Sequence, residues 1–109
     1  MAGRGTQRKG RRRPVSEAVE AAGVGMIARM WEVRALGSGF DELLSWVCDQ
    51  ALPKLEVLPQ HVSSEVYSST DNRIVVISKW RSNPESLPAP PESLVARSPH
   101  VWDFAPVDR

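Results

Sequence analysis

Few side chains in this chain have the chemistry of a catalytic group, and the two histidines come first among them. His61 and His100 could act as a general acid or base because imidazole titrates near neutral pH. Both fall where a strand is expected to start beside a loop, a place where solvated histidines without a catalytic role are common. We therefore keep His61 and His100 as candidate acid–base residues, with the solvated role as the simpler interpretation.

The single cysteine and the lack of ligand-like spacings argue against thiol or metal chemistry. Cys48 falls in the apolar stripe of an expected helix, where a buried thiol is unreactive. Two isolated histidines with no second cysteine do not match a zinc site. No glycine-rich phosphate loop and no G-x-S-x-G sequence is present. The sequence therefore predicts neither a metal site nor a cofactor.

Aromatic residues are the other candidates for a site. Trp80 shares a strand face with Ile74, Val76 and Ser78, so it either lines a substrate pocket or packs in the core, where its N–H needs one partner. Trp31 and Trp102 alternate inward from their strands, which is typical of core or interface anchors. Both interpretations of Trp80 stay open at this point.

The elements that position these residues follow from hydrophobic periodicity. Two-residue alternation predicts strands at 26–35, 61–69, 73–80 and 101–107, and Asp71-Asn72 predicts a hairpin turn between the second and third. Apolar residues at three- and four-residue intervals predict a helix from Phe40, which Pro53 should kink or end. Pro91 could open a short helix through Arg97. The order β-α-β-β-(short α)-β is that of an α+β, ferredoxin-like fold with a four-stranded antiparallel sheet.

The start of the chain differs from the rest. Residues 1–25 carry six basic and two acidic side chains, whereas residues 26–109 carry eight basic and eleven acidic ones. We expect residues 1–25 to be a disordered basic tail, or an extension that precedes a true start at Met26, and residues 26–109 to form one domain. The tail has no interleaved aromatics, so a nucleic-acid role is a minor hypothesis. A lone cysteine and the absence of a long apolar run favour a cytoplasmic protein without a membrane segment.

The strings MIARMWEVRA, GFDELLSWV, RIVVISKW and HVWDF resemble, in their order and lengths, the antibiotic-biosynthesis-monooxygenase (ABM)-like superfamily over residues 26–107. The resemblance implies a dimeric α/β-barrel in which two sheets pack face to face, and a pocket between each sheet and its own helices. A covering argument agrees, since the sheet face without helices needs a cover and a second copy is the simplest one.

The resemblance also implies a choice of chemistry. The haem-degrading branch needs an Asn on the first strand and a His on the second helix, and both are missing here although Trp80 matches its Trp. The branch that oxidises aromatic polyketides without a cofactor uses Asn, Trp, Tyr and Arg. The candidate pocket-lining residues that follow from this are Trp80, Tyr67, Arg29 and Trp31.

Three functional hypotheses result. The first is a homodimeric, cofactor-independent monooxygenase or a binder of an aromatic or quinonoid small molecule. The second is a non-catalytic dimeric barrel that has lost the pocket, which the proline-rich replacement of the second helix favours. The third is association with nucleic acid through the basic tail.

Overall fold

A computed structural model of the chain describes residues 26–109, so the expectations for residues 1–25 lie outside it. The described chain forms four strands and one bulged helix. The strands are β1 (Ile27–Ala35), β2 (His61–Ser68), β3 (Arg73–Trp80) and β4 (Val95–Phe104), and the helical segments are α3 (Phe40–Trp46), a π-helical turn (Val47–Ala51) and α4 (Leu52–Glu56).

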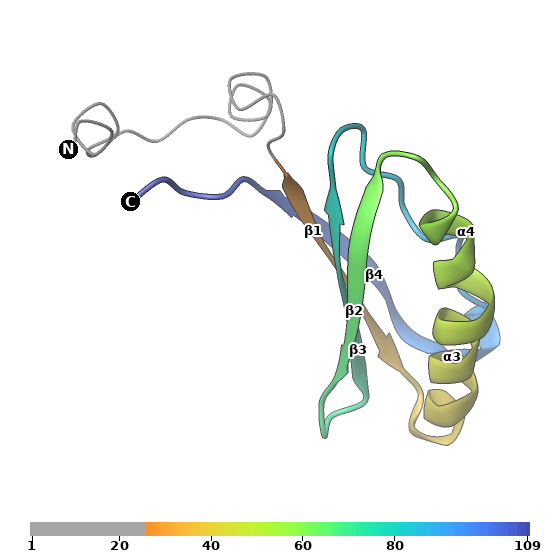
Figure 1. The fold of residues 1–109 in the computed structure, drawn as a ribbon. Helices are drawn as coiled ribbons and strands as arrows, with labels where there is room; N and C mark the ends of the chain where they lie inside the picture. The colour runs from red at the N-terminus through yellow and green to blue at the C-terminus, as the bar shows by residue number, and fades with distance from the viewer. Residues whose placement is uncertain (1–25) are drawn as a thin grey trace, which may run out of the picture.

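The strands form one antiparallel sheet in the order β2-β3-β1-β4. This is the strand order of a ferredoxin-like fold, and the expected α+β class with a four-stranded antiparallel sheet is confirmed. Figure 1 shows the helix lying against one face of the sheet, while nothing in the described chain lies against the other. We call these the helix face and the open face.

The helix passes through Pro53 instead of ending there. Proline has no N–H to donate to the carbonyl four residues earlier. The helix accommodates the missing hydrogen bond by widening to a π-helical turn just before Pro53. In this turn the Leu52 N–H donates to the Val47 carbonyl. The widened turn also changes which side chains face the sheet. Val47 and Ala51 are buried, whereas Cys48 is exposed, so the expectation of a buried Cys48 is wrong.

The second helix expected at 91–97 is not formed. A single 3-10 turn, Glu92–Leu94, stands in its place, and the last strand begins at Val95 instead of Val101. The prolines before it hold the chain extended, and the segment from β3 to β4 runs down beside the helix (Figure 1). Two of its side chains, Leu87 and Leu94, are buried against the core.

The hydrophobic core lies between the helix face of the sheet and the helical segments that pack on it. From β1 it takes Trp31, Val33 and Ala35, and from β3 it takes Ile74, Val76 and Trp80, in the two-residue alternation that the sequence predicts. The helical segments supply Leu43, Val47, Ala51, Leu52 and Leu55.

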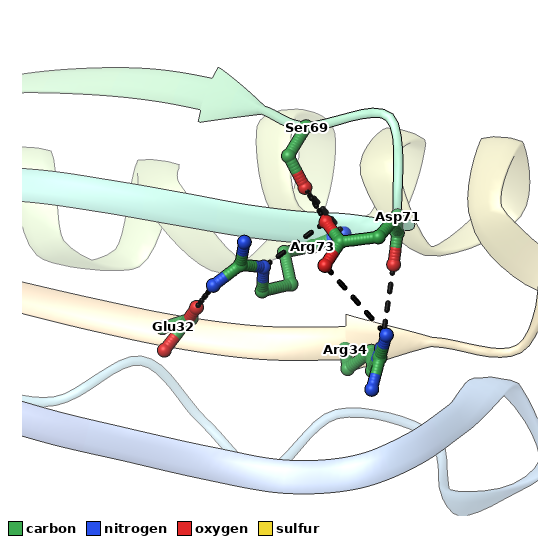
Figure 2. Close-up of polar contacts among 5 residues, drawn as sticks. All are labelled: Glu32, Arg34, Ser69, Asp71 and Arg73. Carbon is green, nitrogen blue, oxygen red and sulfur yellow. Dashed lines mark hydrogen bonds and ion pairs between the residues drawn. The ribbon is translucent and has the colours of Figure 1, made fainter.

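An ion-pair network fixes the β2–β3 hairpin to the end of β1 (Figure 2). Asp71 accepts from the Ser69 hydroxyl and from Arg73 Nε at 3.0 Å, and it pairs with Arg34 at 3.6 Å. Arg73 also reaches Glu32 on β1 at 3.2 Å. Asn72 occupies the left-handed region at φ 68°, which asparagine tolerates in a tight turn. The expected Asp71-Asn72 turn is therefore confirmed.

This network should make the hairpin sensitive to acid. Hydrogen bonds from Ser69 and Arg73 lower the pKa of Asp71 from 3.8 to about 2. A lowered pKa in the folded state means that the stabilisation is complete above pH 3.8 and is lost as the pH falls towards 2. We expect Asp71→Asn to lower the urea midpoint slightly at pH 6, with the difference from wild type vanishing near pH 2. A difference that stays constant over this range would contradict the role of the carboxylate.

Candidate functional site

A line of polar side chains crosses the helix face, which is otherwise apolar. Arg29 on β1 is the register partner of Asp103 on β4 and of Ser78 on β3, and Ser78 is in turn the partner of Ser64 on β2. Register partners project to the same side of a sheet. Asp103, Arg29, Ser78 and Ser64 therefore form one row across all four strands, which we call the polar row.

Arg29 is the centre of the polar row. Its Nε and Nη2 donate to the two carboxylate oxygens of Asp103 at 2.7 and 2.9 Å, and its Nη1 donates to Ser86 Oγ at 3.0 Å. The Arg29 side chain is 16% exposed and that of Asp103 is 34% exposed. A bidentate pair of this kind holds the guanidinium plane in a fixed orientation.

The two charges of this pair stabilise each other. The hydrogen bond to Asp103 raises the pKa of Arg29, against the opposing effect of burial, and the hydrogen bond from Arg29 lowers the pKa of Asp103. Both groups are consequently ionised throughout the neutral range. The site carries a fixed cation with N–H donors beside an apolar core.

The other half of the row is neutral. Trp80 is fully buried, and its indole N–H donates to Ser78 Oγ at 2.8 Å. The His61 ring meets the Trp80 ring edge-on at 5.2 Å, and His61 Nε2 lies 2.8 Å from Ser64 Oγ. His61 and Trp80 therefore close the end of the polar row at the start of β2.

The structure brings some of the sequence candidates together and separates others. Arg29, Trp31, Trp80 and His61 all lie on or beside the helix face. Tyr67 lies on the open face, is 51% exposed and donates to Glu65 at 2.7 Å. His100 also lies on the open face, where it stacks on Trp102.

Asp103, Ser86, Ser78 and Ser64 were not singled out as site residues from sequence. Ser64 and Ser78 were each visible as a hydroxyl interrupting an apolar alternation, but their alignment across strands depends on register, which one sequence does not provide. Within residues 26–109 no three potential ligands gather as a metal site. In the same part of the chain, no helix has the length and apolarity to cross a membrane.

Comparison with known proteins identifies the class of fold. No protein-family model and no curated protein matches the chain. Among solved structures, it is similar to the crystal structure of a monooxygenase from the gene ActVA-Orf6 of Streptomyces coelicolor in complex with the ligand Nanaomycin D. The likeness covers 84% of this chain and 95% of that one, with a TM-score of 0.56 and 16% identity. The ferredoxin-like fold of the single chain that the ABM-like resemblance implies is thus confirmed.

Proposed function

We propose that this protein binds an aromatic or quinonoid small molecule at the charged half of the polar row, beside Arg29 and Asp103, as a homodimeric barrel of the monooxygenase-like type. The observation that carries the proposal is the bidentate Arg29–Asp103 pair on the helix face, in which the Arg29 side chain is 16% exposed and held in a fixed orientation. Arg29 also keeps N–H groups that neither Asp103 nor Ser86 engages, and these can donate to an anionic ligand. The solved structure with the same fold was determined with a small molecule bound.

The chemistry that fits such a site is oxygenation of a phenol without a cofactor. Arg29 would hold the phenol as its anion, which lowers the cost of removing its proton. The electron-rich anion transfers electrons to O₂, a C–O bond forms at the ring, and the ring hydroperoxide loses water to leave a quinone. Phenol and O₂ thus give quinone and water, and no other oxidant or reductant is required.

A direct test uses the full-length chain and two naphthalene probes. Binding is measured by titration with 2-hydroxy-1,4-naphthoquinone, which is an anion at neutral pH. Turnover is measured with 1,5-dihydroxynaphthalene and O₂, following 5-hydroxy-1,4-naphthoquinone by absorbance above the rate without protein. Saturable binding supports the proposal, and turnover adds the monooxygenase activity to it. No binding to either probe at millimolar concentration would count against the proposal.

The role of Arg29 can be tested by a substitution that keeps its charge. Arg29→Lys retains a cation but loses the planar fork that Asp103 holds. We expect the affinity for 2-hydroxy-1,4-naphthoquinone to fall about tenfold or more. Arg34→Lys is the matched control, because Arg34 lies on the open face and is 45% exposed. An equal loss in both variants would show that the guanidinium of Arg29 has no specific role in binding.

The proposal of a homodimer rests on the apolar side chains of the open face. Apolar side chains from three strands gather there: Ala28, Met30, Val75, Ile77, Trp102 and Phe104. Trp102 is 41% exposed and Phe104 is 51% exposed in the single chain. A contiguous exposed apolar surface of this kind is typical of a protein interface, and a second copy offers the same surface in return.

One observation favours the non-catalytic alternative. Trp80 has no exposed surface, and its only polar group is satisfied by Ser78. The part of the helix face beside Trp80 is therefore packed. In that alternative the dimer persists, and neither naphthalene probe binds.

A further inference from the structure

One buried polar group on the helix face has no partner among residues 26–109. Trp31 lies on β1, two residues from Arg29 on the same face, and is 4% exposed. Its indole N–H has no acceptor among residues 26–109. Buried tryptophan N–H groups are normally paired. The fold alone does not account for this donor.

Two residues of the polar row carry further unpaired donors. Ser78 is 3% exposed, and its oxygen accepts from Trp80, but within the described chain its own O–H has no acceptor. Arg29 uses three of its N–H groups on Asp103 and Ser86. A guanidinium has about five, so two remain.

These donors share one neighbourhood. Ser78 is the register partner of Arg29, and Trp31 follows Arg29 by two residues, about 7 Å along the same face. Both carboxylate oxygens of Asp103 are already engaged by Arg29. The neighbourhood therefore holds a surplus of donors, and what it lacks is an acceptor.

The same neighbourhood borders an exposed apolar side chain. Val101 on β4 is the register partner of Trp31, so it projects from the helix face, yet it is 41% exposed. Asp103 follows it along β4 at 34% side-chain exposure. The helix face of β4 thus remains accessible beside the donors, and a flat ring could lie there against Val101.

We infer that Arg29, Trp31 and Ser78 form a subsite for an oxygen acceptor of the ligand, a quinone carbonyl or a phenolate oxygen, with the ring of the ligand against Val101. This inference deepens the proposed function and rests on it. It assigns to Trp31 a donor role that is separate from the packing of its ring. Removing its N–H should weaken ligand binding in a protein that remains folded.

The indole N–H signals of the full chain provide the first test. Each of the four tryptophans gives one indole signal in a ¹H–¹⁵N spectrum, assigned by Trp→Phe variants. Addition of 2-hydroxy-1,4-naphthoquinone should shift the Trp31 indole proton downfield, as a new hydrogen bond requires, whereas naphthalene, which has no oxygen, should not. A Trp31 signal that stays in place while the quinone binds elsewhere would overturn the inference.

The Trp31→Phe variant provides the second test. We expect it to bind 2-hydroxy-1,4-naphthoquinone about tenfold more weakly while remaining folded at the temperature of the titration, as circular dichroism would show. Trp46→Phe makes the same change on the helix, outside the polar row and the open face, and should bind as the wild type does. Equal affinity of wild type and Trp31→Phe would refute the donor role while leaving the proposed function intact. Failure of the wild type to bind would instead refute the proposed function itself.

Discussion

Replacing Trp80 with alanine is expected to lower the free energy of unfolding by about 3–5 kcal/mol. The side chain is completely buried in the cluster formed by the sheet and the helix, so its removal leaves a cavity that rigid neighbours cannot fill. The free energy of unfolding of a whole domain is only about 5–15 kcal/mol. The variant should therefore unfold at a much lower urea concentration, measured by circular dichroism.

Trp46→Ala is the matched control, because Trp46 is only partly buried at the margin of the same cluster. Trp46→Ala should lower the free energy of unfolding by a clearly smaller amount than Trp80→Ala. Trp80→Phe should fall between the two, since it keeps a ring but leaves the Ser78 hydroxyl without its donor. A loss of less than about 1 kcal/mol for Trp80→Ala would mean that Trp80 faces an open pocket instead of a packed core.

The fold could be predicted because its signals are local. Alternation in β1 and β3 and the apolar stripe after Phe40 each specify an element and its buried face, and the order of elements then leaves few topologies. The incorrect predictions concern places where the backbone adjusts locally to a residue that does not fit the regular element. Pro53 was expected to kink or end the helix, but one widened turn lets the helix continue, and this places Cys48 on the surface.

The last strand shows a different limit. The last strand was expected to begin at Val101, yet β4 begins at Val95 and runs through Pro99. β4 is an edge strand with one unpaired side, and its pairing with β1 shifts register between Glu32 and Ala35. An edge position and an irregular register are where proline is tolerated in a sheet. Neither property can be read from the sequence before the neighbours of the strand are known.

The candidate site depends on the same long-range information. Arg29 was a candidate from the sequence, but its partner Asp103 lies 74 residues away and Ser86 lies 57 residues away. Tyr67 was grouped with Arg29 by residue type, and strand register places it on the opposite face. Residue types suggested a chemistry, whereas only the register of four strands shows which residues share a surface.

The homodimer leads to the second large prediction. Ile77 on β3 and Met30 on β1 are register partners at the centre of the open face. Four strands of about eight residues present roughly 500 Å² per copy, or about 1,000 Å² for a pair, which is near the lower limit for a specific interface. Such an interface cannot tolerate a buried charge at its centre. Ile77→Lys should therefore weaken the dimer by at least about 100-fold.

Sedimentation of the full-length chain at micromolar concentration measures this effect. The variant should remain folded, because a lysine at position 77 lies opposite Glu65 on β2, with which it can pair in the monomer. Val57→Lys makes the same change at a valine that is 78% exposed outside the sheet, and it should leave the dimer unchanged. A wild-type monomer at these concentrations would refute the dimer. A dimer that survives Ile77→Lys would mean that the copies meet through another surface, so the apolar open face would need a different partner.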